Sequence, residues 1–281
     1  MQLSSLENLP KVPKLKLAVI GHVEWMTFLK IDSFPQAGLI SHGEIYQEEP
    51  AGGGAVTAIQ IAKLTQSSVH LFTSLGRDSE GEKSFLRLQK LGLKVSVAWR
   101  DLPTRKGISM LDKRGERAIT VIGERLEPKA KDQLPWNELK SFDGVFVTAT
   151  DIDALSLCRE AAIMVATPRI GLNKLQKSGV KLDALIGSAL DPDEKKHLLT
   201  NQTFTQLRIA TEGASGGQAW PGGRYESFRL TSKLIDSYGC GDSFAGGVTT
   251  GLAAGWTIEQ AISLGAHCGA HCATHLGPYS E

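Results

Sequence analysis

The sequence is poor in the features that mark secreted and membrane proteins. Its 281 residues include only four cysteines, whose irregular spacing predicts no disulfide framework and favours a reducing compartment. No apolar run approaches the roughly 20 residues of a membrane-spanning helix. Residues 1–16 are polar, with scattered lysine and proline, and lack the apolar segment of a signal peptide. We therefore expect a cytoplasmic protein without a membrane partner.

The chain also lacks a surplus of either charge. Its 31 lysines and arginines balance 30 aspartates and glutamates, which gives a net charge of +1. Because nucleic-acid-binding proteins usually carry a basic surplus, we expect no nucleic-acid partner, and any preference for anions must be local. Hydrophobic residues make up 41% and charged residues 22%, which is typical of a soluble globular protein.

Two familiar nucleotide-binding motifs are absent. No Gly-x-x-x-x-Gly-Lys-Ser/Thr sequence occurs, so the chain has no P-loop. Gly239 and Gly241 would need a third glycine at position 244 to complete a dinucleotide-binding fingerprint, but Phe244 occupies that position. A nucleotide that binds this chain must be held in another way.

What the chain does contain is an alternation of strand-like and helix-like segments. We expect strands at residues 15–21, 69–73, 144–148, 163–167, 184–186 and 207–211, with helices between them and two more after residue 241. This order predicts one α/β domain over residues 1–281, built on a parallel sheet with helices on both faces. Two β-rich excursions, at about 26–48 and 96–122, are expected to pair into a small lid over the carboxyl edge of the sheet, where ligands bind in such folds.

The stretch Asp236–Gly247 is the most informative part of the sequence. Gly239 and Gly241 allow a sharp turn and close approach of backbone N–H groups to a ligand, and a helix-compatible run follows. Such a loop binds anions, and Asp242 inside it could take a proton from a hydroxyl during phosphoryl transfer. The alternative is an ordinary turn in which Asp242 caps the helix. This stretch alone leaves both interpretations open.

A second glycine cluster lies far away in the sequence. Gly52, Gly53 and Gly54 immediately precede an apolar, helix-compatible segment at residues 55–64. They form either another point of close backbone approach to a ligand or a flexible connector, and a connector does not explain why a helix of small residues starts directly after it.

Together these motifs resemble a known family. Asp236-Ser237-x-Gly239-x-Gly241-Asp242 is similar to a signature of the ribokinase-like (PfkB) carbohydrate kinases, and Ala51-Gly52-Gly53-Gly54 resembles that family's N-terminal glycine signature. The resemblance implies a three-layer α/β/α sandwich with a mostly parallel sheet and a small β-strand lid. It also implies ATP- and Mg²⁺-dependent phosphorylation of a sugar-like hydroxyl, with Asp242 as general base and the N–H groups of Gly239, Cys240 and Gly241 as the anion hole. We read Cys240 as a small buried residue, not a nucleophile.

The resemblance implies further site residues. Substrate would contact Glu24, Gly52, Gly53, Gly54, Arg105, Arg169 and Asp242. The alternative for Arg105 and Arg169 is a solvated surface charge. The nucleotide would contact Thr211, Gly213, Gly216, Gly241, Ser188 and Asp191. Asp191 would help to hold Mg²⁺ through water, and Asp236 with Ser237 and the loop near Gly277 would hold a monovalent cation such as K⁺. Exposed lid edges favour a homodimer formed through the lid.

Three positions depart from the family pattern. Glu24 and Met26 stand where relatives often carry Asn and Asp for sugar hydroxyls, and Asp191 stands for a longer glutamate. The pocket is therefore altered, which keeps two alternatives open. One is a nucleoside kinase, in which Trp25 could stack on a base, although a core position for Trp25 is an equal alternative. The other is a catalytically weak sensor that binds sugar or nucleotide.

One rival site lies near the C-terminus. His267, His271 and His275 are spaced to share one helix face, with Cys268 and Cys272 beside them, and His and Cys are good zinc ligands. Ligands on one helix normally need others from elsewhere. The alternative is that the cysteines pack in the core and the histidines line a partly exposed stripe.

Overall fold

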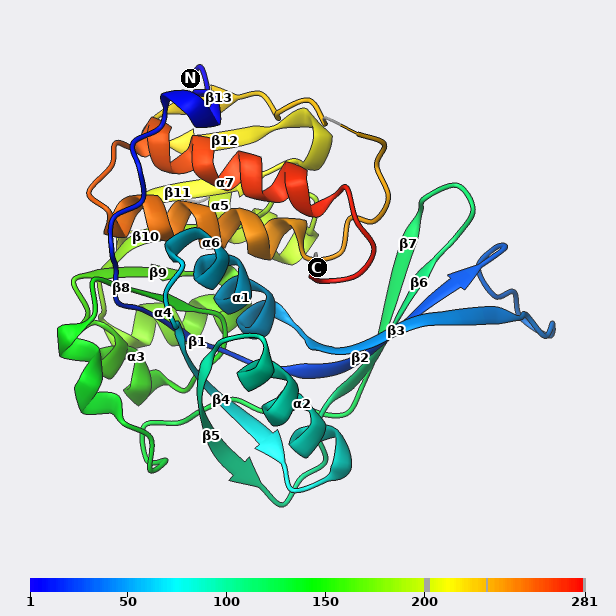
Figure 1. Ribbon diagram of the computed structural model, residues 1–281. Helices are drawn as coiled ribbons and strands as arrows, with labels where there is room; N and C mark the ends of the chain where they lie inside the picture. Colours follow the sequence, from blue (N-terminus) through cyan, green and yellow to red (C-terminus); the bar gives the residue numbers. More distant parts are fainter. Residues whose placement is uncertain (200–202, 231, 280–281) are drawn as a thin grey trace.

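Two β-sheets organise the computed structural model, which describes residues 1–199, 203–230 and 232–279 (Figure 1). The larger sheet has nine strands in the order β13-β12-β11-β10-β9-β8-β1-β4-β5, and the strands from β11 to β5 are parallel. The hairpin β12–β13 continues it in the antiparallel sense. The strands are β1 (Leu17–Ile20), β4 (His70–Gly76), β5 (Lys94–Arg100), β8 (Gly144–Val147), β9 (Ile163–Ala166), β10 (Leu182–Ser188), β11 (Thr205–Thr211), β12 (Gly217–Trp220) and β13 (Gly223–Tyr225).

Helices cover both faces of this sheet because its strands are apolar on both sides. On β1, Leu17 and Val19 enter one hydrophobic cluster, and Ala18 and Ile20 enter the other. The first cluster lies under α1 (Gly53–Thr65), α2 (Ser79–Lys90), α6 (Cys240–Ala253) and α7 (Ile258–Cys272). The second lies under α3 (Ile152–Cys158), α4 (Leu172–Ser178) and α5 (Pro192–Leu199). The predicted three-layer α/β/α sandwich is confirmed. Short 3-10 turns add η1 (Leu6–Asn8), η2 (Trp136–Ser141), η3 (Pro168–Ile170) and η4 (Gly213–Ser215).

Glycines bring α6 unusually close to its neighbours. A Cβ on Gly247 would lie 2.7 Å from the Cα of Gly265 in α7, and one on Gly246 would lie 3.4 Å from the Thr57 carbonyl of α1. Only glycine allows this approach. The close packing carries the first turn of α6 to the start of α1, so the two glycine motifs meet in space.

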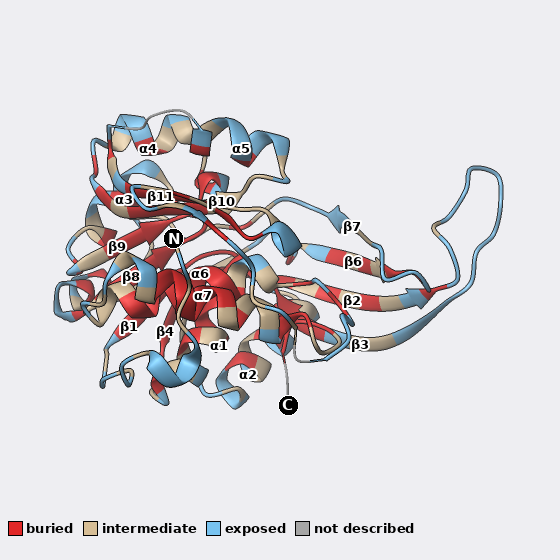
Figure 2. Cartoon of the chain, turned by 90° about the horizontal axis from the view of Figure 1, so that it is seen from above, coloured by how far each residue is buried: buried red, intermediate tan, exposed pale blue. Residues whose placement is uncertain are grey.

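The smaller sheet forms the lid that projects from the body of the molecule (Figure 1, Figure 2). Its strands are β2 (Glu24–Ile31), β3 (Gly43–Ala51), β6 (Lys106–Leu111) and β7 (Arg117–Ile122), in the order β3-β2-β6-β7. The two predicted excursions therefore pair with each other. The second lid segment was predicted to begin too early, because residues 96–100 belong to β5 in the main sheet, where they pair with β4.

Among the described residues, no helix combines the length and the apolar character needed to cross a membrane.

Candidate active site

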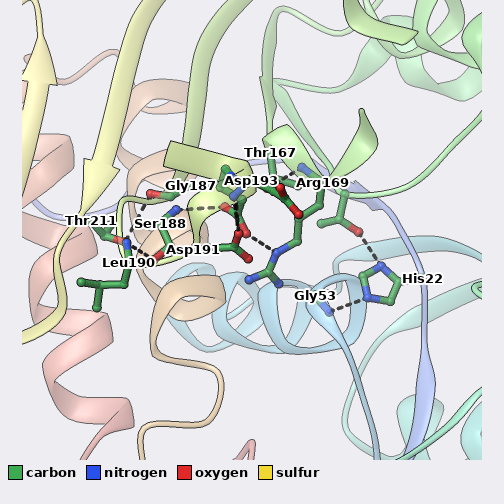
Figure 3. A network of polar contacts seen from close by, with 12 residues as sticks. His22, Gly53, Thr167, Arg169, Gly187, Ser188, Leu190, Asp191, Asp193 and Thr211 are labelled. Atoms are coloured by element: carbon green, nitrogen blue, oxygen red, sulfur yellow. Dashed lines mark hydrogen bonds and ion pairs between the residues drawn. The ribbon is translucent and has the colours of Figure 1, made fainter. Parts of the chain in front are cut away.

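The carboxyl edge of the main sheet carries a row of polar residues, each following a different parallel strand. His22 follows β1, Thr148 follows β8, Arg169 follows β9, and Ser188 and Thr211 end β10 and β11 (Figure 3). Ligands bind at this edge in open α/β sheets. A cavity of about 510 Å³ opens here, and its wall also includes Asp242 and lid residues of β2 and β7. We call it the acceptor cavity.

A second, more apolar cavity of about 310 Å³ adjoins the acceptor cavity. Its walls come from the end of β11, the segment after β13, and helices α6 and α7. Phe228, Phe244 and Ala270 are among its lining residues, so the cavity is suited to a flat, largely apolar group. The two cavities share lining residues Thr211, Gly213, Ser237, Cys240 and Gly241. They meet at the start of α6.

The first turn of α6 separates the two cavities. Gly239 is the N-cap residue, with φ +78°, a conformation that favours glycine. The first hydrogen bond of the helix runs from the Ser243 N–H to the Gly239 carbonyl, at 2.8 Å. The Cys240 N–H makes a long 3.4 Å bond to the Ser237 carbonyl. The remaining N–H groups of this turn have no intrahelical acceptor, and the positive end of the helix dipole lies here. The geometry is that of an anion site.

The Asp242 side chain is not a helix cap, so that alternative is wrong. The helix starts two residues earlier than predicted, at Cys240, and no side-chain capping bond is present. The Asp242 carboxylate instead lines the acceptor cavity, beside Gly53 of α1. Burial raises the pKa of this carboxyl above its usual value, Glu194 raises it further, and the nearby charges of Arg169 and Arg117 oppose the rise. A carboxylate with a raised pKa is a better general base.

The glycines at positions 52–54 close the floor of the acceptor cavity. Gly52 has φ +86° and donates its N–H to the Tyr238 hydroxyl at 3.3 Å. A Cβ on Gly54 would lie 2.7 Å from the His22 carbonyl, which accepts the Gly54 N–H at 3.1 Å. These contacts show why glycine is needed here, and the connector interpretation is wrong.

Glu24 lies at the root of β2, buried, with Arg105 Nη1 at 3.1 Å from its Oε1. Burial raises the pKa of Glu24, and the charge of Arg105 is the largest effect in the opposite direction. Met26, two residues along the strand, is fully buried in the lid and does not line the cavity. Trp25 points to the other side of the strand, toward Lys83 of α2. Its predicted stacking on a base is therefore wrong.

His22 connects the glycine floor to this carboxylate. Its Nε2 accepts the Gly53 N–H at 3.4 Å, which places the ring proton on Nδ1, 3.3 Å from the Thr148 hydroxyl. Burial, followed by the charges of Arg125, Arg169 and Arg105, holds the pKa of His22 well below its usual value. The imidazole is therefore neutral, and its Nε2, which lies 3.5 Å from Glu24 Oε1, forms no ion pair with that carboxylate.

Arg169 reaches the cavity and pairs with a residue that sequence reasoning missed. Its Nε lies 2.5 Å from Glu194 Oε1, and Glu194 Oε2 accepts the Ser188 N–H at 2.9 Å. Asp191 has a different place: its carboxylate accepts the N–H groups of Asp193 and Glu194 and so starts α5, and it does not line the acceptor cavity (Figure 3). Glu194 was detectable as an acidic residue shortly after a strand end.

Two more arginines of the cavity were missed. Arg117 comes from β7, and its Nε donates to the Ser237 hydroxyl at 3.3 Å. Arg125 follows β7 and donates to the Arg169 carbonyl at 3.0 Å. Neither belongs to a recognisable motif: Arg117 directly follows the turn between β6 and β7, and Arg125 follows the end of β7.

The predicted cation site has its carboxylate already in use. Asp236 is buried and accepts from Tyr46 Oη, the Tyr238 N–H and the Gly277 N–H, at 2.9 to 3.2 Å. The region near Gly277 therefore adjoins Asp236, as expected. It offers Asp236 a backbone N–H donor, however, and a cation would need an oxygen acceptor.

The histidine-rich segment does not gather ligands. α7 ends at Cys272, before His275, and His267 stacks on Phe228 with ring centroids 3.6 Å apart. No group of three His, Cys, Asp or Glu side chains among the described residues is arranged to hold a metal ion. Cys268 and Cys272 are buried. A hydrogen bond with Cys272, and burial, raise the pKa of the Cys240 thiol, which disfavours a nucleophilic role.

Comparison with known proteins decides the family. A model of the pfkB family carbohydrate kinases matches residues 14–168 and 180–281. The chain belongs to this family. It is a carbohydrate kinase. A ribokinase from Lactococcus lactis is 25% identical over 266 residues, which cover 89% of this chain and 87% of the relative. An ATP-dependent ribose-1-phosphate kinase from Halopiger xanaduensis is 24% identical, with 88% of each chain covered.

Solved structures have the same fold as this kinase. The ribokinase of Thermotoga maritima superposes with a TM-score of 0.73 at 22% identity, over 94% of each chain. The adenosine kinase of Sinorhizobium meliloti superposes with a TM-score of 0.76 at 15% identity, over 95% of this chain and 96% of that one. At these identities the likeness concerns the fold and leaves the substrate open.

Proposed function

We propose that this carbohydrate kinase transfers the γ-phosphoryl group of ATP to a hydroxyl of a small sugar or sugar-like molecule, with Asp242 as general base. The observation that carries the proposal is the junction of the two cavities at the start of α6. A nucleotide base in the apolar cavity and an acceptor in the polar one would direct their reacting ends to the same helix N-terminus. Relatives named as ribokinase and as ATP-dependent kinase support this reading.

Each residue of the junction then has a task. The backbone N–H groups at the start of α6 stabilise charge on the transferring phosphoryl group. The predicted anion hole consists of the N–H groups of Gly239, Cys240 and Gly241. Asp242 orients the acceptor hydroxyl and takes its proton as the P–O bond forms. Thr211, Gly213 and Gly216 border the nucleotide side. Glu24 accepts hydrogen bonds from acceptor hydroxyls, and the glycine floor allows the acceptor to approach Asp242 closely.

Mg²⁺ would enter with the nucleotide. It needs only one or two carboxylates besides phosphate oxygens and water. Of the three carboxylates that line the cavity, Asp242 and Glu194 are the candidates for this role, because Arg105 pairs with Glu24; Asp191 caps α5. When bound, the ion would neutralise phosphate charge. Asp236 and Ser237 fit a monovalent cation poorly, because protein donors occupy the Asp236 carboxylate and Arg117 donates to Ser237. We therefore assign K⁺ no step; a comparison of turnover in K⁺ and in tetramethylammonium tests this.

Purified protein should consume ATP when offered a suitable sugar or nucleoside, as measured by ADP release. Stimulation by nucleosides alone would favour the nucleoside kinase. Shifts in melting temperature with some acceptor and no ADP release with any would favour the sensor and overturn the kinase proposal. The complete Asp242 and glycine-loop geometry argues for catalysis over sensing.

We also propose a homodimer formed through the lid. The lid face that points away from the acceptor cavity carries a group of apolar residues, Trp25, Leu29, Ile45, Ile108, Met110 and Ile122, beside the polar residues Thr27, Glu48, Lys106 and Thr120. Ile45 and Ile122 are more than half exposed. Burial of this face against a second copy would remove it from water. Light scattering tests the proposal, and a monomer would contradict it. The cytoplasmic location remains a prediction from the cysteine pattern.

A further inference from the structure

The acceptor cavity contains more cationic than anionic side chains. Its walls include three carboxylates and four arginines, namely Glu24, Glu194, Asp242, Arg105, Arg117, Arg125 and Arg169. These arginines come from different parts of the chain and converge only in the folded protein. A neutral sugar needs hydrogen-bonding partners for hydroxyls, which carboxylates and amides provide equally well. Four guanidinium groups suit an anion better.

Two of these arginines are balanced within the protein. Arg105 pairs with Glu24 at 3.1 Å, and Arg169 pairs with Glu194 at 2.5 Å. Arg117 leans toward the start of α6, with its Nε 3.9 Å from Asp236 Oδ1. It is therefore placed near the predicted phosphoryl-transfer point.

Arg125 is left without an anionic partner. Within the described part of the chain, no carboxylate lies within 4.0 Å of its guanidinium, and its Nη2 donates to the Arg169 main-chain carbonyl at 3.0 Å. Glu127, two residues after Arg125, is paired with Lys174, whose Nζ lies 2.9 Å from Glu127 Oε1. Burial lowers the pKa of Arg125, the charges of Glu127 and Glu24 oppose this effect, and the charges of Arg105 and Arg169 add to it. Arg125 therefore has carboxylates in its wider surroundings, but none of the described carboxylates forms an ion pair with it.

The three arginines act on one place in the cavity. Arg105, Arg125 and Arg169 all lower the pKa of His22 and of Glu24, which locates their charges around the root of β2. Arg105 also keeps a donor in reserve: its Nε has no hydrogen-bond partner among the residues described. Cations that lie close together repel one another, and a bound anion offsets this repulsion.

We propose that the acceptor of this kinase is a sugar monophosphate, whose phosphate group binds at Arg125 between Arg105 and Arg169 while one of its hydroxyls faces Asp242. The inference rests on the proposed kinase function and names the substrate class. Phosphate is favoured over carboxylate because it carries up to two charges and three acceptor oxygens, which match several guanidinium groups around one point. The cavity of about 510 Å³ is within the usual range for a ligand of this size.

The first test is a panel of acceptors at saturating MgATP, with ADP release as the readout. It compares ribose 5-phosphate, glucose 1-phosphate and glucose 6-phosphate with ribose, glucose and inosine, and with gluconate and glucuronate. We expect kcat/KM for at least one sugar phosphate to exceed that of its neutral parent by about 100-fold or more. A preference for neutral sugars or nucleosides overturns the inference but keeps the kinase proposal. A preference for sugar acids over phosphates overturns the phosphate assignment.

The second test is the substitution Arg125→Met, which removes the charge and keeps most of the volume. We expect it to lower kcat/KM for the sugar phosphate about 10- to 100-fold, mainly through KM, and to lower kcat/KM for the neutral acceptor by less than about 3-fold. Arg77→Met is the matched control, because Arg77 is exposed and its ion-pair partner Asp101 is exposed as well. Equal losses on charged and neutral acceptors would mean that Arg125 supports the fold of the cavity, and would contradict the proposal.

Calorimetric titration of ribose 5-phosphate, glucose 1-phosphate and glucose 6-phosphate with ADP present separates the two proposals. If no acceptor is turned over, the kinase proposal fails. Binding of a sugar phosphate that Arg125→Met weakens, and Arg77→Met does not, would still support the anion site. Equal binding by the wild type and Arg125→Met, or no binding, overturns it.

Discussion

The carboxylate of Asp242 lies directly over the backbone of Gly53, although 188 positions separate the two residues in the sequence. A Cβ built on Gly53 would lie 3.1 Å from Asp242 Oδ1 and 3.5 Å from His22 Cε1. The glycine therefore leaves room for the general base and for the hydroxyl that it would activate. The two glycine motifs of this kinase form one site, with the second supplying the base and the first keeping its surroundings open.

Gly53→Ala should reduce turnover about 10-fold or more, because the new methyl group displaces the Asp242 carboxylate by a few tenths of an ångström. Gly241→Ala is the matched variant, since a Cβ there meets nothing within 4 Å in the free protein. It should fold normally and raise KM for ATP, because position 241 borders both cavities. Steady-state kinetics and melting curves measure both. An unchanged kcat in Gly53→Ala would show that the space between position 53 and the Asp242 carboxylate does not limit turnover.

Asp242→Asn should lower kcat by about 10²- to 10⁴-fold while nucleotide binding is largely kept. The same substitution should raise the melting temperature at neutral pH by a few degrees. The sign follows from the raised pKa: folding disfavours the charged carboxylate, so the folded state is destabilised above that pKa, and the neutral amide removes the cost. A fall in melting temperature would show that the carboxylate is well paired.

The pH profile should report the charges around Asp242. Because the base must be deprotonated, activity should fall as the pH drops through its raised pKa. Arg169→Met removes a charge that lowers this pKa, so the acid limb of log kcat should move to higher pH. Glu194→Gln removes a charge that raises it and should move the limb to lower pH. Shifts of the same sign in both variants would argue that another group titrates.

Glu194→Gln should also destabilise the fold, by about 1–3 kcal/mol, because Arg169 loses its partner and the amide satisfies the Ser188 N–H less well. Asp193→Asn, on the exposed side of the same helix, is the control and should change stability by about 0.5 kcal/mol or less. Denaturant unfolding measures both. Equal effects would indicate that the helix terminus, and not the buried contact, is responsible.

Local sequence patterns determined much of this protein. The alternation of apolar strands and helices predicts the layered fold, because a strand covered on both faces is mostly apolar, as the fully buried β1 is. The glycine stretches predict close backbone approach, and Asp242 was identified because a carboxylate in an anion-binding loop needs a function. The β-rich character of the two excursions predicted the lid. Residues 96–100 of the second excursion were misassigned, because an edge strand of the main sheet and a lid strand share the same alternation.

Tertiary structure alone decided which side chains face the acceptor. Glu194 reaches the cavity and Asp191 does not, because α5 begins at Pro192 and its first turn directs one carboxylate inward and uses the other as a cap. Arg125 enters it because β7 returns the chain to the edge of the main sheet, where Arg125 contacts Arg169. Arg117, at the turn end of β7, enters it because that part of the lid lies beside Ser237. No local pattern carries this information, since the charge around Glu24 is a sum over residues that are distant in the sequence and neighbours only after folding.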